Sequence, residues 1–111
     1  MILLVLILNK EEHLEEILEL FVELGVSGAT IIDSVGMGRI LSHDIPIFAG
    51  FRSLMRGSRP YNKTIFSIVP EELVPDIVEG VEKICGSLDE PGTGLIFTIP
   101  IDKVWGLKPS F

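Results

Sequence analysis

The chain has 111 residues, which is enough for one domain with a single modest core. Hydrophobic residues make up 47% of it, as in globular proteins, so disorder of the whole chain is excluded, and a net charge of −7 argues against a nucleic-acid binder. The one cysteine, Cys85, excludes an internal disulfide framework and a zinc site made of cysteines alone.

The first predicted element is a strand at residues 1–8, which are all apolar. A membrane span needs about 20 such residues, and a signal peptide needs a basic start that this segment lacks. The run therefore predicts a strand buried on both faces. We expect a cytoplasmic protein that is not embedded in a membrane.

A helix and a second strand follow. Asn9 stands where a helix cap is expected, with Glu12 in the position that answers it. Glutamates fill the outer face of this helix, which Gly25 ends, and residues 29–35 predict a strand that stops at Gly36. The inner face repeats with the helical period at Leu14, Ile17, Leu18, Phe21 and Leu24.

The second half of the chain repeats this pattern. Residues 64–69 predict a third strand, and a second helix begins between Pro70 and Pro75, because proline suits the first turn of a helix but not its interior. Gly86 closes this helix, and residues 95–101 predict a fourth strand.

The predicted order is that of a ferredoxin-like α+β fold, βαββαβ, in one domain of residues 1–111. It has an antiparallel sheet, two helices on one face and a long loop between the second and third strands. Because both faces of the first strand are apolar, an uncovered sheet face would expose much hydrocarbon to water. Oligomerisation through the open sheet face is the expected remedy.

The connection from Gly36 to Lys63 holds most of the positive charge. Its net charge is +4, with one acid, Asp44, whereas the rest of the chain has four lysines and fifteen acids, a net charge of −11. Compact proteins seldom contain so long a connection without a function. We expect it to meet an anionic ligand or an acidic surface. Its basic residues are Arg39, Arg52, Arg56, Arg59 and Lys63.

Two glycine turns flank the predicted sheet, at residues 36–39 and at residues 92–94. In the βαββαβ order, the end of the second strand and the start of the fourth lie near the same edge of the sheet, within one subunit or across an interface. Glycine lets the backbone approach an anion, and Arg39 and Lys63 can add charge to such a cradle. Each turn alone is a weak indication, and neither is a Walker loop or a dinucleotide fingerprint.

The sequence offers little for catalysis or for metal binding. His13 lies on a helix beside glutamates and His43 lies next to Asp44, but neither has a serine or cysteine in a recognisable catalytic setting. Cys85 is expected to be an inert core thiol. These two histidines and the cysteine would form a metal site only across subunits. We expect no enzyme and no metal site. A small enzyme such as an acylphosphatase would need an arginine-bearing loop after the first strand.

The chain resembles the PII signal-transduction family, the nitrogen regulatory protein P-II superfamily, as a divergent PII-like member. Residues 23–30, 35–39, 66–70 and 92–97 are similar to the family's first helix end, T-loop base, third strand and B-loop. The resemblance implies a non-enzymatic homotrimer that binds an adenine nucleotide (ADP, AMP or ATP) or a small anionic metabolite between subunits. It also implies a role in nitrogen regulation and a flexible T-loop, about residues 38–62 here, that docks on a transporter or enzyme.

The resemblance assigns residues to this site by matching position. Along the adenine it places Gly28, Ala29 and Thr30. At the phosphates it places Gly36, Met37, Gly38 and Arg39 from the T-loop base, Gly92, Thr93 and Gly94 from the B-loop, and Lys108 at a C-terminal arginine position. Lys63 is added to these ligand residues because of its charge beside the glycine turn. Because of their charge, we also expect Arg52, Arg56 and Arg59 of the basic segment to contact the partner protein.

The chain also departs from the family pattern. Ile40 replaces a T-loop glutamine, Leu95 replaces the B-loop lysine, Gly106 replaces one C-terminal arginine, and Tyr61 lies at the wrong end of the loop for covalent modification. Charged hydrogen bonds contribute roughly 1.5–3 kcal/mol each, so losing two cations weakens triphosphate binding by several kcal/mol. The alternative is a trimeric metal-associated or structural protein, like the ion-tolerance relatives, that binds no nucleotide.

Overall fold

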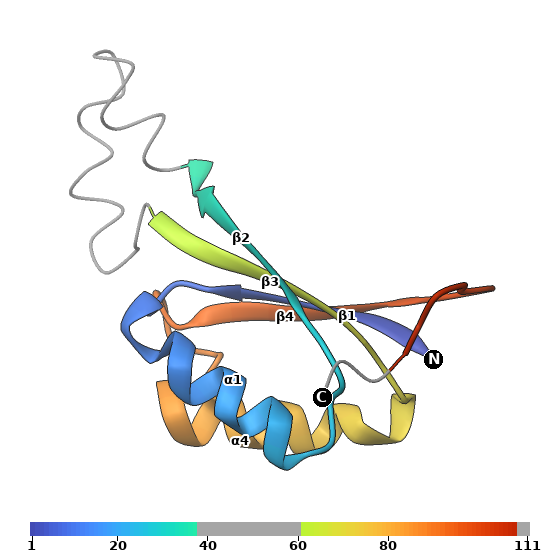
Figure 1. Cartoon of the computed structure of the whole chain (residues 1–111). Helices are drawn as coiled ribbons and strands as arrows, with labels where there is room; N and C mark the ends of the chain where they lie inside the picture. Colours follow the sequence, from blue (N-terminus) through green and yellow to red (C-terminus); the bar gives the residue numbers. More distant parts are fainter. Residues whose placement is uncertain (38–60, 109–111) are drawn as a thin grey trace.

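The computed structural model describes residues 1–37 and 61–108 (Figure 1). Its strands are β1 (Ile2–Leu8), β2 (Thr30–Val35), β3 (Tyr61–Val69) and β4 (Gly94–Pro100). Its helices are α1 (Leu14–Glu23) and α4 (Val74–Cys85), each preceded by a short 3-10 helix, η1 (Glu11–His13) and η4 (Glu71–Leu73). This element order confirms the predicted ferredoxin-like α+β fold.

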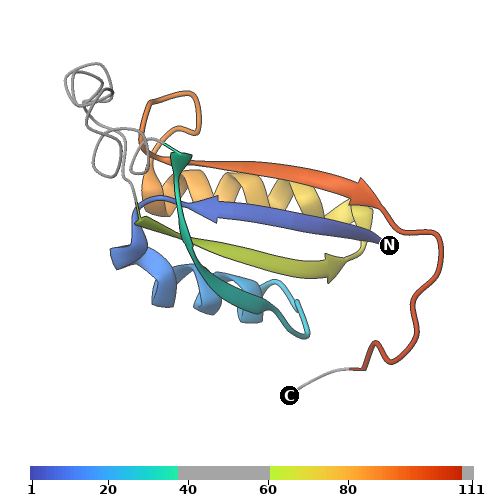
Figure 2. The ribbon, with the colours of Figure 1, turned by 90° about the horizontal axis from the view of Figure 1, so that it is seen from above.

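The four strands form one antiparallel sheet in the order β2-β3-β1-β4. Both helices cover the same face of this sheet (Figure 1), and β2 and β4 are its two edges (Figure 2). None of the helices in the described parts of the chain is long and apolar enough to cross a membrane.

The core lies between the helices and the covered face of the sheet. Its residues come from alternate positions of the strands and from one stripe of each helix, as the sequence periodicity predicts. The buried cluster comprises Ile2, Leu4, Leu6, Leu8, Ile17, Phe21, Val26, Ile65, Val69, Ile77, Val81 and Cys85. The helices pack closely where Gly80 faces Leu20, since a Cβ atom at Gly80 would lie 2.6 Å from Leu20 Cδ1.

Two local predictions are wrong. The residue at the N-cap position of η1 is Lys10, without a side-chain cap hydrogen bond, and Asn9 Oδ1 instead accepts a hydrogen bond from Asn62 Nδ2 at 3.2 Å. The amide of Asn9 therefore joins the neighbouring strand and does not cap the helix. β3 begins at Tyr61 and not at residue 64, because Tyr61 pairs with Val35 across the sheet.

The face of the sheet away from the helices is apolar over β1 and β4, whereas β2 and β3 add the polar residues Thr30, Ser34, Asn62 and Thr64 to it. On this face Leu95, Phe97 and Ile99 are 56%, 43% and 46% exposed. Val5 lies on the same face but is only 3% exposed, because Phe66 and Phe97 pair with it from either side. A continuous apolar face of this kind is a surface that a second chain can cover.

Candidate functional site

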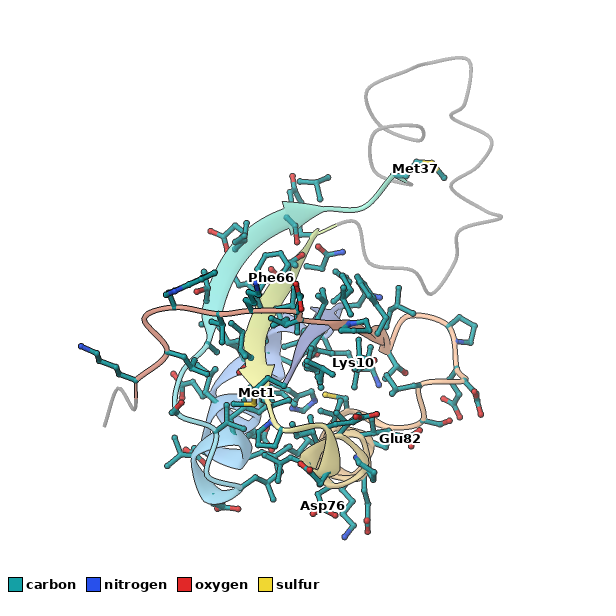
Figure 3. All side chains as sticks on the ribbon, turned by 90° about the vertical axis from the view of Figure 1, so that its right-hand side faces the viewer. Met1, Lys10, Met37, Phe66, Asp76 and Glu82 are labelled. Carbon is teal, nitrogen blue, oxygen red and sulfur yellow. The ribbon has the colours of Figure 1, made fainter. Side chains whose placement is uncertain are left out.

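The predicted ligand residues that the structure describes lie in three places. Residues 28–30 lead into β2 and lie near Lys108. Gly36 and Met37 follow the end of β2 (Figure 3), and residues 92–94 form the turn into β4. Outside the described residues lie Gly38, Arg39, Arg52, Arg56 and Arg59.

The two glycine turns lie at the same end of the sheet but on opposite edges. In the strand register, Leu8 of β1 pairs with Gly94 on one side and with Lys63 on the other. Lys63 in turn pairs with Asp33 of β2, so the start of β4 and the end of β2 share one row. Because β1 and β3 separate them, the two edges are about 14 Å apart. Within one chain the two turns therefore do not lie near the same edge, and their meeting across an interface stays a prediction.

The turn at residues 92–94 needs glycine. Gly92 and Gly94 have φ angles of 83° and 151°, which other residues rarely adopt. A Cβ atom at Gly94 would lie 2.5 Å from the carbonyl oxygen of Ile7. The backbone of this turn therefore packs directly against β1, and its position depends on the absence of a side chain.

Thr93 is buried within the same turn. It is 2% exposed, and among the described residues its Oγ1 has no hydrogen-bond partner. Leaving a buried hydroxyl unpaired costs about 1–3 kcal/mol, so such a group in a native structure calls for an explanation. One such explanation is that the hydroxyl donates to a ligand oxygen, since glycine turns can bind anions.

Residues 28–30 and Lys108 line one pocket of about 430 Å³, within the usual range of small-molecule sites. Ser67 Oγ donates to the carbonyl oxygen of Gly28 at 2.7 Å, which holds this segment against β3. The pocket offers apolar walls, which suit a flat ring, and one cation. The walls come mainly from Leu3, Phe66, Ile68 and Leu107.

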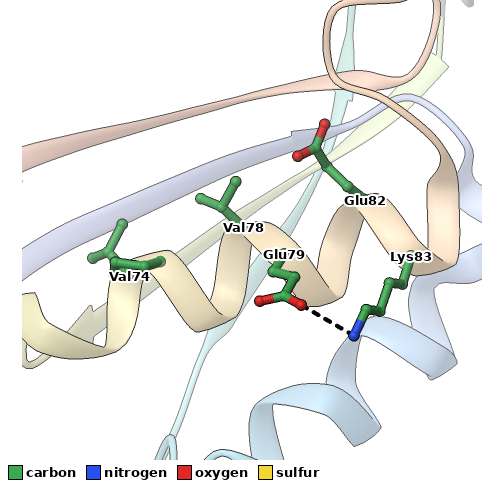
Figure 4. Close-up of a pocket in the computed structure, with 6 residues that line it drawn as sticks. Val74, Val78, Glu79, Glu82 and Lys83 are labelled. Carbon is green, nitrogen blue, oxygen red and sulfur yellow. Dashed lines mark ion pairs between the residues drawn. The ribbon is translucent and has the colours of Figure 1, made fainter.

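A larger hollow of about 560 Å³ lies along α4 and contains none of the predicted ligand residues (Figure 4). Val74 and Val78 form its apolar part, and Lys83 Nζ lies 3.1 Å from Glu79 Oε1. This hollow is shallow, and its lysine already has a carboxylate partner. The pocket beside residues 28–30 is therefore the better candidate site.

Lys63 already has anionic partners. By register its side chain lies on the helix-covered face of the sheet, where Nζ donates to the Asp33 carboxylate and lies 3.7 Å from Glu11 Oε1. The hydrogen bond to Asp33 raises the pKa of Lys63 above its ordinary value of 10.5, against a smaller opposing effect of desolvation. In this conformation the carboxylates of Asp33 and Glu11 neutralise the positive charge of Lys63, which the sequence analysis assigned to a phosphate.

A polar cluster at the same end of the sheet was missed by the sequence analysis. We call Asn9, Ser34, Asn62 and Thr64 the amide–hydroxyl cluster. Ser34 Oγ donates to Asn62 Oδ1 and lies 2.8 Å from Thr64 Oγ1, and Asn62 is only 7% exposed. The available indication was the spacing of Asn62 and Thr64, which are two residues apart and therefore lie on one face of the strand.

Within residues 1–37 and 61–108, no group of three or more histidine, cysteine, aspartate or glutamate side chains could hold a metal ion. Cys85 is buried in the core, and burial raises the pKa of its thiol. His13 Nδ1 lies 2.8 Å from Glu16 Oε1, and His43 lies outside the described residues.

The fold and site define a small ferredoxin-like protein with an exposed apolar sheet face and glycine turns at one end of its sheet. The family model of the nitrogen regulatory protein P-II matches residues 1–110, so the chain belongs to this family of regulatory proteins. No curated protein matches the sequence significantly.

Proposed function

We propose that the protein is a cytoplasmic regulator, not an enzyme, that acts as a homotrimer. It binds an adenine nucleotide or a small anionic metabolite in clefts between neighbouring subunits. It then docks on a target protein, a transporter or an enzyme, through the basic segment of residues 38–62. The position of the two glycine turns, at one end of the sheet but on opposite edges, carries this proposal.

Edge pairing between copies would bring the two turns together. The antiparallel pairings make β2 and β4 run in opposite directions, so β2 of one copy can pair with β4 of the next and continue the sheet around a closed ring. The end of β2 then lies beside the start of β4 of its neighbour. Both edges carry exposed apolar side chains, and pairing between copies would remove them from water. On β2 these are Ile31, Ile32 and Val35, and on β4 they are Leu95, Phe97 and Ile99.

The dimensions of the site suit a nucleotide. Thr30, beside the apolar pocket, and Asp33, in the row of Gly94, are three residues apart on β2, a distance of about 10 Å. An adenine ring in the pocket could therefore place a phosphate near the turns. Thr93 Oγ1 supports this placement, because among residues 1–37 and 61–108 this buried hydroxyl has no hydrogen-bond partner, and it lies in the turn that would receive the phosphate.

The available charge favours a weakly charged ligand. Lys63 is balanced by carboxylates, and Leu95 stands where the family has a lysine, which leaves Lys108 and Arg39 as the cations of the site. Two cations suit one or two phosphate groups better than three. We therefore expect AMP and ADP to bind more tightly than ATP.

Thermal unfolding with added nucleotide tests this function. A ligand at 100 times its Kd stabilises the folded state by about 2.7 kcal/mol, so millimolar AMP and ADP should raise the Tm and ATP should raise it less. Lys108→Gln should reduce the shift, whereas Lys103→Gln, an exposed lysine that does not line the pocket, should preserve it. Absence of a shift with all three nucleotides would rule out the nucleotide site.

The partner role of the basic segment needs a separate test. Replacing Arg52, Arg56 and Arg59 together by alanine should leave folding and trimer formation intact and abolish capture of the target. If the triple variant captures the target as the wild type does, the charge of the segment is incidental.

A further inference from the structure

The amide–hydroxyl cluster lies where three separate parts of the chain meet. Ser34 is near the end of β2, Asn62 and Thr64 are near the start of β3, and Asn9 follows β1. The register places Ser34, Asn62 and Thr64 on the sheet face away from the helices. The cluster is therefore a polar group on a face whose other residues, Thr30 apart, are apolar.

Its hydrogen bonds run in one direction. Ser34 has a single hydroxyl proton and donates it to Asn62 Oδ1, so Thr64 is the donor in the 2.8 Å contact with Ser34. Asn62 Nδ2 then donates to Asn9 Oδ1 at 3.2 Å. Bonds in such a chain strengthen one another. Because Asn62 is buried, its amide has no easy replacement partner if one bond is lost.

The two ends of the cluster lie next to residues that lead into the two glycine turns of the proposed site. Ser34 precedes Val35, whose partner Tyr61 is the first described residue after the basic segment. At the other end, Asn9 directly follows Leu8, which pairs with Gly94 across the sheet. A continuous set of contacts therefore runs from the turn at residues 92–94 to the base of the basic segment within one chain.

We propose that the amide–hydroxyl cluster couples the position of the turn at residues 92–94 to the end of β2. A shift of this turn moves Asn9, changes its hydrogen bond to Asn62 and so alters how firmly Ser34 holds the end of β2. This inference deepens the proposed function by naming the connection between ligand and docking segment. The coupling itself is a property of the ligand-free chain.

The opposite face of the sheet supplies a control. There Lys63 links Asp33 of β2 to Glu11 of η1, so the same strands carry an ionic connection as well. This connection is exposed and is weakened by salt, whereas a buried amide bond is not. Asp33→Asn removes the ionic connection and leaves the amide–hydroxyl cluster intact.

Amide hydrogen exchange of the full ligand-free chain, measured by NMR, tests the coupling. Ser34→Ala should speed exchange at residues 8–9 and 94–96, although Ser34 touches neither, by about five- to tenfold, the factor produced by losing one ordinary hydrogen bond. Asn9→Ala should speed exchange at residues 34–37 in return, because coupling is reciprocal. Asp33→Asn should leave residues 94–96 unchanged.

Faster exchange confined to the mutated strand and its direct neighbours, in both Ser34→Ala and Asn9→Ala, would overturn the proposal. If either variant fails to fold, Thr64→Val removes the first donor with little change of shape and should produce the same distant effect at smaller size. The measurement needs no nucleotide, so its failure is distinguishable from failure of the proposed ligand site.

Discussion

Replacing Thr93 by valine tests whether its hydroxyl serves a ligand and not the fold. Valine keeps the branched shape of threonine, and the side chain is almost fully buried. The hydroxyl has no partner among the described residues, and an unpaired buried group costs about 1–3 kcal/mol. The variant should therefore be more stable than the wild type by about 1 kcal/mol, taking the low end of that range.

The assay is urea and thermal unfolding with and without AMP. A gain of 1 kcal/mol corresponds to a rise in Tm of about 4–8 °C for a chain of this size. Affinity for AMP should fall by about 10- to 150-fold, because a hydrogen bond to a charged group contributes about 1.5–3 kcal/mol. Thr98→Val, on the strand that follows this turn but exposed, should change stability by less than about 0.5 kcal/mol and leave AMP binding unchanged.

Two results would refute this reasoning. If Thr93→Val is less stable than the wild type by 1 kcal/mol or more, the hydroxyl has a structural partner. If the variant is more stable but binds AMP as tightly as the wild type, the hydroxyl is unpaired and lies outside the ligand site.

Three further predictions concern stability and reactivity. Gly94→Ala should lower the free energy of unfolding in urea by more than about 2 kcal/mol, because it adds a clash with β1 to backbone strain. The control is Gly25→Ala, with φ of 83° and open space around it, which should lower it by about 1 kcal/mol. Equal losses would contradict the packing of the turn. The raised pKa of Lys63 means that its ion pair stabilises the fold below pH 10.5 and that this contribution is lost as pH rises through the folded value. Asp33→Asn should flatten the fall of the urea midpoint above that pH, and identical profiles would show that the pair contributes nothing. Iodoacetamide should alkylate Cys85 far more slowly in the folded protein than in urea, since burial keeps the thiol protonated, and equal rates would place it at the surface.

The fold could be predicted from sequence because each element has a clear local pattern. The apolar run of residues 1–8 and the helical stripes gave the element order, and the order gave the arrangement of the sheet. The start of β3 and the role of Asn9 could not be predicted, because both depend on partners far away in the chain. Tyr61 belongs to the sheet because it pairs with Val35, and the Asn9 side chain accepts a hydrogen bond from Asn62 in place of capping the helix.

The glycine turn at residues 92–94 was predictable from the sequence, but the geometry around it was not. Positive φ angles at Gly92 and Gly94 match what the sequence indicated. The separation of the two turns follows from the order of four strands, and that order fixes distances that no local motif contains. Lys63 was assigned to a phosphate because its charge is visible in the sequence, whereas the carboxylate of Asp33 beside it appears only once the strands are paired.

The central claim is that neighbouring copies complete the ligand site together. Chains carrying Thr93→Val and chains carrying Arg39→Ala, each expected to bind AMP weakly alone, can be unfolded together in equal amounts and refolded as mixed trimers. If β4 of one copy and the β2 end of the next form each site, calorimetry should show wild-type affinity restored at about a quarter of the sites, the statistical share. If each chain holds a whole site by itself, mixing will restore none, and the claim is contradicted.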